Sequence, residues 1–467
     1  MTEAAEASLR TSHFKVIAAS SLGTVFEWYD FYLYGLLATI ISSQFFSGVN
    51  DSTAFILALA AFAAGFAVRP FGALVFGRIG DLVGRKNTFL VTMGIMGAST
   101  FAVGLLPSYA TAGIAAPLML VGLRLLQGLA LGGQYGGAAT FVAEHAPEGK
   151  RGFYTSFIQT TATLGLFAAL LMVIGTREWI GEDAFKSWGW RLPFMASALL
   201  LGISMWIRLQ LNESPVYQQM KAAGTTSKAP LTEAFGNWRN LRLVLIALFG
   251  AVAGQAVIWY AGQFYALFYL EKILKVDGAT ANILIAIALA LGTPFFVFFG
   301  WLSDKIGRKP IIMTGCLLAA LTYFPLFHAL TEAANPALAH AQKSQPVVVF
   351  ANEDTCSLQF DPIGKTTFDK TECDIAKSAL AKAGIPYTSH DTPGDTVMRI
   401  GRTQIPIVDK ASFDAALPGQ LATAGYPAAG ETPQLDKPRV VLVLFALVLL
   451  VTMVYGPIAA LLVELFP

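Results

Sequence analysis

The chain is poor in charged residues and in histidine, and it lacks the short motifs of the common enzyme classes. Only 13% of its 467 residues are charged, about half the share of an ordinary soluble domain. The five histidines match no metal-ligand spacing, and no P-loop, nucleophile elbow or zinc motif occurs. The formal net charge is only +2, with no basic patch of the kind that binds nucleic acid. We therefore expect no enzyme, no metal site, no cofactor and no nucleic-acid partner.

Cysteine is also scarce, with three residues and no C-x-x-C motif of a metal or redox site. Cys316 lies in an apolar run, where a packing role is expected. Cys356 and Cys373 lie in the one long polar stretch of the chain. If that stretch lies outside the cytoplasm, a disulfide between these two cysteines can form and persist.

Apolar sequence is abundant instead, since 55% of the residues are hydrophobic and the mean hydropathy is +0.58. A helix needs about 20 apolar residues to cross the hydrocarbon core, and a backbone in lipid must satisfy its own hydrogen bonds. Ten runs meet this requirement, at residues 15–40, 53–77, 88–107, 114–142, 154–175, 190–210, 241–270, 280–302, 310–330 and 439–463. The sequence therefore predicts an all-α protein that crosses a membrane ten times.

The lysines and arginines between these runs predict the orientation of the chain. Most of them fall in alternate connections, including residues 78–86, 150–151, 221–242 and 305–309, whereas the other connections carry few. Because cytoplasmic loops are enriched in Lys and Arg, the N-terminus is expected in the cytoplasm. Residues 331–437 are then expected outside.

Residues 331–437 differ in character from the rest of the chain. They contain a strand-like run, a helix-like run that ends at a glycine, a second short apolar run and a Pro/Gly-rich tail, at Val347–Phe350, Asp374–Ala383 with Gly384, Ile405–Val408 and 418–438. We predict a small α/β insertion followed by a linker. A structural cap and a solute-capturing module both remain open as its role.

A ten-residue motif occurs twice. Residues 77–86 read Gly-Arg-Ile-Gly-Asp-Leu-Val-Gly-Arg-Lys, and residues 300–309 read Gly-Trp-Leu-Ser-Asp-Lys-Ile-Gly-Arg-Lys. Five pairs share one offset of 223 residues, namely Gly77 with Gly300, Asp81 with Asp304, Gly84 with Gly307, Arg85 with Arg308, and Lys86 with Lys309. The charge rule for inner loops explains the basic residues but not the repeated Gly and Asp. We interpret both copies as a cytoplasmic gate, in which an Asp pairs with an Arg of a neighbouring element.

Four ionisable residues lie inside the apolar runs, where a charge costs about 2.5–3.5 kcal/mol at a helix centre. They are Glu27, Asp30, Arg69 and Arg124. Glu27 and Asp30 are three residues apart and share a helix face, so their charges repel and one of them holds a proton more readily. Asp30 is our first candidate for a proton carrier and Glu27 the second. A permanent pair with Arg69 or Arg124 is the alternative.

Arg124 is the main candidate for binding a solute, because a guanidinium can hold a carboxylate in bidentate fashion. An internal salt bridge with Asp30 is the alternative, and Arg69 is a candidate for an intramembrane ion pair. Other polar or aromatic residues in the runs are further candidates for solute binding, namely Tyr34, Gln134, Tyr135, Gln255, Trp259 and Gln263. The glycines around Gln134 are spaced for close helix packing.

These motifs resemble those of the major facilitator superfamily, whose members carry G-x-x-x-D-x-x-G-R-K after helices two and eight. A narrower resemblance is to the metabolite:proton symporter family, which includes proline/betaine, shikimate, α-ketoglutarate and citrate transporters. It depends on residues 26–35, 69–72, 124–128, 132–137, 150–152 and 212–215. The resemblance covers nearly all of the chain except 331–437. The family usually has Glu where this chain has Gln134.

The resemblance implies a monomeric secondary transporter in a bacterial-type cytoplasmic membrane, with two pseudo-repeated helical bundles that move a small polar solute with protons by alternating access. Twelve helices are implied and ten are found, so the second bundle is expected to be truncated. The expected parts are a first bundle, a cytoplasmic linker, helices seven to nine, the insertion and helix ten, at residues 1–212, 213–240, 241–330, 331–437 and 438–467. The alternative is a membrane sensor or solute-binding protein that uses the insertion and does not transport.

Overall fold

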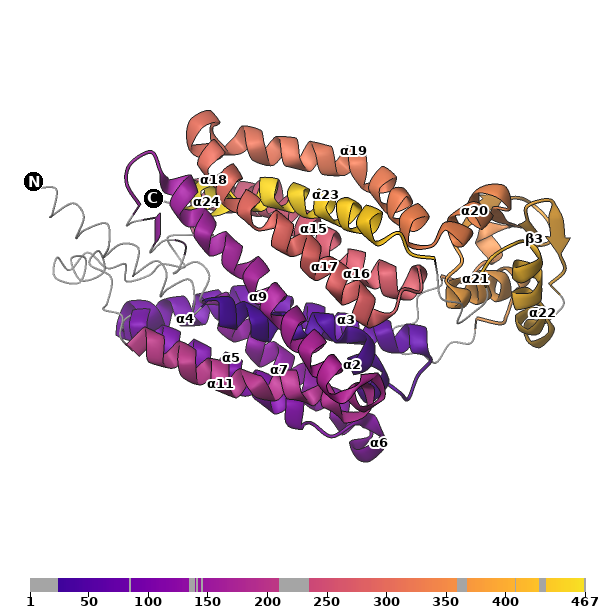
Figure 1. Cartoon of the computed structure of the whole chain (residues 1–467), viewed down its shortest axis with the longest axis horizontal. Helices are drawn as coiled ribbons and strands as arrows, with labels where there is room; N and C mark the ends of the chain where they lie inside the picture. The colour runs from indigo at the N-terminus through magenta and orange to yellow at the C-terminus, as the bar shows by residue number, and fades with distance from the viewer. Residues whose placement is uncertain are drawn as a thin grey trace, which may run out of the picture.

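The structure is a computed structural model, and it describes residues 24–83, 85–133, 139, 142–143, 146–209, 235–358, 368–407, 409–427 and 434–465. Long helices make up most of it, and a small sheet lies beyond one end of the helical bundles (Figure 1). Helices long and apolar enough to cross a membrane occupy Thr53–Ile79, Ala115–Gly132, Arg151–Ile180, Trp238–Ile273, Gly278–Ile306, Arg308–Ala334 and Lys437–Leu465. Shorter apolar helices occupy Leu90–Leu105 and Arg191–Trp206. Together with the helix whose described part covers residues 24–36, these segments coincide with the ten predicted runs.

The first bundle is built from segments of the N-terminal half. They are residues 24–36, α2 (Ala38–Phe45), α3 (Asp51–Ala67), α4 (Arg69–Val83), α5 (Arg85–Leu105), α6 (Tyr109–Ala112), α7 (Ala115–Gly132), α9 (Arg151–Ile180), α10 (Glu182–Ala184), the π-helical η1 (Phe185–Gly189) and α11 (Arg191–Leu209). Glycines allow α7 to pack closely against α3 and α4. A Cβ atom on Gly128 would collide with the Gly65 carbonyl oxygen, and a Cβ atom on Gly132 would collide with the Arg69 carbonyl oxygen. This close approach fixes α7 beside the start of α4.

The second bundle comprises a long mixed helix and five regular ones. They are α14 (Trp238–Leu245), η2 (Ile246–Val252), α15 (Ala253–Tyr260), η3 (Ala261–Tyr265), α16 (Ala266–Phe268), η4 (Tyr269–Ile273), α17 (Gly278–Gly292), α18 (Pro294–Ile306), α19 (Arg308–Ala334), α23 (Lys437–Tyr455) and α24 (Ile458–Leu465). In the mixed helix, π-helical turns η2, η3 and η4 alternate with α-helical ones. Such wide turns are rare and occur often at functional sites.

The two bundles meet along α9, which crosses between them and packs against α17 and α18 (Figure 1). The small residues Gly152 on α9 and Gly300 on α18 lie at the crossing. A Cβ on Gly300 would lie 2.5 Å from the Ser156 Cβ and 2.7 Å from the Gly152 carbonyl oxygen. The crossing therefore requires glycine at this position.

The insertion is an α/β unit with a four-stranded sheet. It contains α20 (Pro336–Ser344), β1 (Val347–Ala351), the 3₁₀ turn η5 (Glu353–Thr355), α21 (Glu372–Ala383), β2 (Tyr387–Asp391), β3 (Val397–Ile400), β4 (Thr403–Ile405) and α22 (Lys410–Thr423). The strand order is β2-β1-β3-β4, with β1 parallel to β2 and antiparallel to β3, and β3 antiparallel to β4. The predicted strand and helix are confirmed, and Gly384 ends α21 with a left-handed φ of 71°.

The prediction that a linker starts at Pro418 is wrong for residues 418–423, because α22 continues to Thr423 with Pro418 inside it. Phe413, Leu417 and Leu421 form a buried stripe on this helix, and their burial offsets the hydrogen bond that the proline removes. Asp409 caps the N-terminus of this helix. Its carboxylate accepts hydrogen bonds from the Ser412 backbone N–H and hydroxyl, and these bonds lower the pKa of Asp409. Of the predicted run at 405–408, Ile405 ends β4 and Val408 lies outside the described residues.

The insertion leaves and rejoins the second bundle at one place. It follows α19 and precedes α23, and these two helices lie side by side (Figure 1). The Asp436 backbone N–H donates to the Ala333 carbonyl at 2.9 Å. Arg439 on α23 forms an ion pair with Glu332 on α19 at 3.0 Å. The two connections therefore touch each other at the root of the insertion.

Candidate functional site

Arg124 lies on α7 with 1% of its surface exposed. Its guanidinium Cζ is 4.4 Å from the centre of the Tyr34 ring, and Nη1 donates to Gln127 Oε1 at 2.6 Å. Gln127 in turn donates to Thr100 Oγ1 at 2.8 Å, so its orientation is fixed. Nε and Nη2 of Arg124 have no hydrogen-bond partner among the described residues. A buried guanidinium held on one side therefore keeps donors for a further acceptor.

Arg69, the first residue of α4, is held in a similar way. Its Cζ lies 4.1 Å from the Phe66 ring and 4.4 Å from the Phe31 ring, and Arg124 also lies 5.0 Å from Phe31. The two arginines thus share one aromatic ring, and we call Arg69, Arg124, Phe31, Tyr34 and Phe66 the arginine cluster. The predicted ion pair of Arg69 is not found within the described part of the chain, where cation–π contacts hold the side chain instead.

The mixed helix of the second bundle reaches the arginine cluster. The Tyr260 ring packs edge-on against the Phe66 ring, with the two ring centres 5.3 Å apart. Trp259 stacks on Tyr32 of the first bundle at 5.1 Å. Both bundles therefore contribute to this region, and any movement of one against the other changes these contacts.

The remaining candidates on the mixed helix are also buried. Gln263 is 1% exposed, and neither atom of its side-chain amide has a hydrogen-bond partner in the described structure. Gln255 is buried one turn before Trp259. Gln134 and Tyr135, predicted as solute contacts, lie outside the described residues.

Asp30 and Glu27 are both buried in the helix at residues 24–36. Asp30 Oδ1 has no hydrogen-bond partner in the described structure. Within the described residues, no ion pair joins Asp30 to Arg69 or Arg124. The salt bridge considered as an alternative for Asp30 is therefore not formed here.

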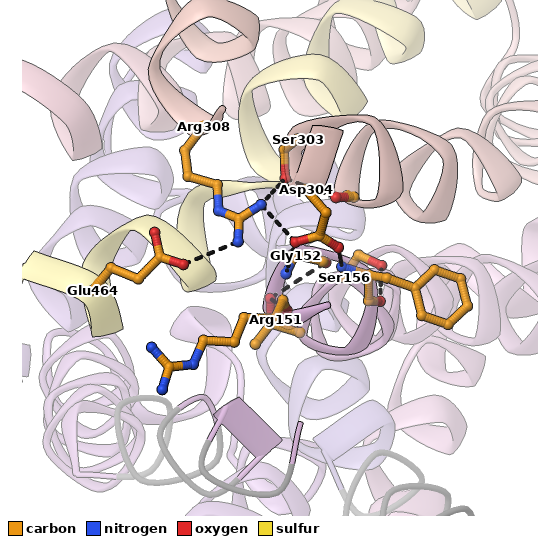
Figure 2. A network of polar contacts seen from close by, with 10 residues as sticks. Arg151, Gly152, Ser156, Ser303, Asp304, Arg308 and Glu464 are labelled. Carbon is orange, nitrogen blue, oxygen red and sulfur yellow. Dashed lines mark hydrogen bonds and ion pairs between the residues drawn. The ribbon is translucent and has the colours of Figure 1, made fainter. Parts of the chain in front are cut away.

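The second motif copy lies at the end of the bundles opposite the insertion (Figure 1). It forms a polar network there, here called the motif-end network (Figure 2). It consists of Gly152, Phe153, Ser303, Asp304, Arg308 and Glu464. Arg308 Nη1 donates to Asp304 Oδ1 at 2.6 Å and to Ser303 Oγ at 3.0 Å, and Nη2 donates to Glu464 Oε1 at 2.9 Å. The Arg308 charge is therefore balanced by two carboxylates.

Asp304 also connects the two bundles. Its Oδ1 accepts from the Gly152 backbone N–H and its Oδ2 from the Phe153 N–H, each at 2.8 Å. These amides belong to the first turn of α9, where backbone donors have no acceptor within the helix and an anion is favourable. We expected the Asp to pair with an Arg of a neighbouring element. Its Arg partner, Arg308, does begin the next helix, α19, although it belongs to the same motif copy, and its partners across the interface between the bundles are backbone amides.

The other motif residues differ in how they are placed. Gly307 has a φ of 94° and allows the turn between α18 and α19, and Lys309 is exposed. In the first copy, no described atom lies within 4 Å of a Cβ placed on Gly77. Asp81, Arg85 and Lys86 lie in helices with side chains outside the described set, and Gly84 is itself outside it.

Several residues of both sites were not identified by sequence reasoning. Gln127 lies three residues after Arg124 and so shares its helix face, a spacing that could have revealed it. Phe31, Phe66 and Tyr260 carry no sequence signal that separates them from the other aromatic residues. The role of the Gly152 and Phe153 amides depends on a contact across 152 residues of sequence.

Comparison with known proteins places the chain in a family. A model of the sugar (and other) transporter family matches residues 15–350. The α-ketoglutarate permease of Escherichia coli is 35% identical over 322 residues, which are 68% of this chain and 72% of the permease. The chain belongs to this family of the major facilitator superfamily. It is therefore a multi-pass membrane protein of a family of transporters, not of enzymes.

Other relatives agree with this assignment. The proline/betaine transporter of Salmonella typhimurium is 36% identical over 324 residues, 67% of this chain and 64% of that protein, so the chain spans less than two thirds of it. The E. coli shikimate transporter is 35% identical over 332 residues, 70% of this chain and 74% of that protein. A solved proton:xylose symporter has the same major facilitator fold, with a TM-score of 0.55, 15% identity, and coverage of 97% of this chain and 82% of the symporter.

Proposed function

We propose that this protein carries a small metabolite with a carboxylate group, together with protons, across a membrane by alternating access between its two bundles. The observation that carries this proposal is the arginine cluster, where two buried guanidinium groups keep donors without partners in the described structure. A buried cation without a counter-charge is costly, so the arrangement favours an anionic ligand.

The chemistry of the cluster narrows the class of solute. A guanidinium can bind a carboxylate through two parallel hydrogen bonds, and aromatic rings favour an apolar or cationic body beside it. Organic acids, amino acids and betaines combine these features. The solutes named for the relatives, proline, betaine, α-ketoglutarate and shikimate, all carry a carboxylate.

Asp30 is proposed as the proton carrier and Glu27 as its neighbour. Two carboxylates near each other in a buried site hold a proton more readily than either alone. Because Asp30 forms no ion pair with either arginine in the described structure, its protonation need not compete directly with a solute carboxylate. We further propose that the motif-end network faces the cytoplasm and holds that end closed, with the insertion outside, as the distribution of Lys and Arg indicates.

Uptake into proteoliposomes tests the proposal. Vesicles that contain the purified chain are given labelled α-ketoglutarate, shikimate, proline or betaine, with and without an imposed gradient that is acidic outside. We expect at least one carboxylate solute to accumulate above equilibrium only when the gradient is present, and a proton ionophore to abolish this accumulation. Gradient-independent movement of every carboxylate solute, or uptake of a neutral sugar in their place, would contradict it.

A cavity favours a second function, solute binding by the insertion. A cavity of about 410 Å3 lies between the second bundle and the insertion. Its walls are mostly apolar, and Lys275 and Lys382 lie at it. If a labelled solute binds but does not cross the membrane, and binding is lost in a Lys275→Ala, Lys382→Ala variant but kept in Arg124→Gln, the binding function holds instead.

A further inference from the structure

Cys356 and Cys373, the two cysteines of the polar stretch, lie together at one edge of the sheet in the insertion. Cys356 follows β1 after the short η5 turn, and Cys373 is the second residue of α21. A disulfide joins them, with Cα atoms 5.5 Å apart. β1 and β2 are parallel, so their carboxyl ends lie together, and the Glu353 N–H donates to Asp391 at the end of β2. The disulfide therefore lies at the carboxyl edge of parallel strands, where α/β folds commonly place reactive groups.

A buried carboxylate holds the two cysteine segments together independently of the disulfide. Asp374, next to Cys373, has no exposed surface. Its Oδ1 accepts from the Ser357 backbone N–H at 2.7 Å, and its Oδ2 accepts from the Ser357 hydroxyl at 2.9 Å. Ser357 is next to Cys356, so this clasp keeps the two sulfur atoms near each other after reduction. Reclosure is then an intramolecular step at high effective concentration.

The two sulfur atoms are not equivalent. Cys356 is half-buried, whereas Cys373 is completely buried in the first turn of α21. An incoming thiolate can reach only the more exposed sulfur, so the Cys373 sulfur is the leaving group. The free backbone amides of a helix N-terminus stabilise a thiolate at that position. Two carboxylates lie in the same turn. Glu372 is exposed, so solvent screens its charge, and buried Asp374 accepts two hydrogen bonds from Ser357 that partly offset its charge.

We propose that Cys356 and Cys373 form a redox-active pair that undergoes thiol–disulfide exchange with a dithiol partner. A thiolate of the partner attacks Cys356 Sγ, the bond between the two cysteines breaks, and its electron pair leaves on Cys373 Sγ. The second thiolate of the partner then attacks the partner's first sulfur, which is bonded to Cys356 in the mixed disulfide. This step releases Cys356 as a thiolate. Two electrons pass from the dithiol to the insertion, and the partner leaves as a disulfide.

A redox titration of the full chain tests this proposal. The chain carries Cys316→Ser, so that only the pair reacts, and is held in lipid nanodiscs without denaturant. It is equilibrated with graded mixtures of reduced and oxidised glutathione, and free thiols are counted with a mass-tagged maleimide. We expect the fraction reduced to follow the glutathione ratio along one curve from both directions. A pair that stays oxidised at every ratio until urea is added is a fixed structural bond and overturns the proposal.

Matched variants test the role of each group. Cys373→Ser leaves Cys356 free, and Cys356→Ser leaves Cys373 free, so glutathione adducts on the two can be compared by mass spectrometry. We expect the adduct on Cys356 to form at least about tenfold faster, because only this sulfur is accessible. Asp374→Ala is expected to slow reclosure of the reduced pair by about tenfold, since both hydrogen bonds of the clasp are lost. Equal adduct rates, or unchanged reclosure, contradict the assignment.

Discussion

Arg308 and Arg124 are both largely buried arginines, but their surroundings are opposite. Arg308 donates to two carboxylates and a hydroxyl at 2.6–3.0 Å. Arg124 donates to one neutral amide and otherwise faces aromatic rings at 4.4–5.0 Å. The charge of Arg308 is balanced by carboxylates of the protein itself, whereas Arg124 has no carboxylate partner among the described residues.

This difference separates two kinds of site. A fully paired network such as the motif-end network stabilises one arrangement of helices, and it loses its bonds when the helices move apart. An arginine with free donors among aromatic rings gains its missing bonds only when a ligand arrives. The first kind of site controls conformation and the second binds, and substitutions at each should affect different measurements.

The largest effect is expected at the unpaired aspartate. Asp30→Asn removes the ionisable group that we assign to proton coupling, so accumulation driven by a pH gradient should be lost while solute exchange is partly retained. Asp304→Asn, at the paired aspartate, should lower the transport rate but leave coupling intact. Both are measured as uptake with and without the gradient in the same proteoliposomes. Normal accumulation in Asp30→Asn removes this residue from the coupling role.

Arg124→Lys should weaken solute binding by about tenfold or more, because the loss of one hydrogen bond to a charged carboxylate costs about 1.5–3 kcal/mol. Lysine keeps the charge but loses the planar fork that matches a carboxylate. Arg308→Lys is the matched control and should change the affinity much less. Equilibrium binding of the labelled solute measures both. Equal losses in the two variants would mean that the two arginines do not differ in the way described.

The two motif copies allow a third test, with Gly300→Ala and Gly77→Ala as a matched pair. A Cβ atom added at Gly300 would lie 2.5 Å from the Ser156 Cβ and 2.7 Å from the Gly152 carbonyl oxygen. A Cβ atom added at Gly77 would have no described atom within 4 Å. Overpacking costs about 1–3 kcal/mol, so Gly300→Ala should increase opening of the motif end by about tenfold. The rate of maleimide labelling of a Thr155→Cys reporter, at a buried position of α9, measures opening. Similar rates in both variants would show that the crossing at Gly300 is not tight.

The smallest effect is expected at the edge of the motif-end network. The Glu464 side chain is 35% exposed and makes a single 2.9 Å ion pair with Arg308. Exposed ion pairs contribute about 0.2–1 kcal/mol, so Glu464→Gln should change Thr155→Cys labelling by less than about fivefold. The effect should shrink further at high salt. A change as large as that of Gly300→Ala would mean that Glu464 has a larger part in closing this end.

The sequence predicted the helices well because hydropathy and charge act locally. The ten apolar runs coincide with helices, and the repeated motif led directly to Asp304 and Arg308. The bonding partners were harder to predict: the Gly152 and Phe153 amides have no side-chain signature, and the aromatic residues around Arg69 come from three separate helices. Pro418 misled the prediction of a linker, since the local rule against proline was overcome by the buried stripe of α22.

The roles of the predicted site residues remain predictions. Arg124, Tyr34 and Trp259 lie close to the interface between the bundles, as expected of solute contacts. Asp30 forms no ion pair with Arg69 or Arg124 among the described residues, which spacing along one helix could not reveal. Sequence alone could not place them relative to one another, because their distances depend on how the helices cross.

The hydrogen bond between Asp436 and Ala333 has a consequence for the history of the molecule. A segment that begins and ends at touching points of the backbone can be gained or removed by a single event in the gene without displacing the helices on either side. Joining residue 334 directly to residue 436 through a short glycine-containing turn should therefore leave the membrane part intact. The insertion can thus be regarded as an accessory module on a surface loop, whose removal does not require the helices on either side to move.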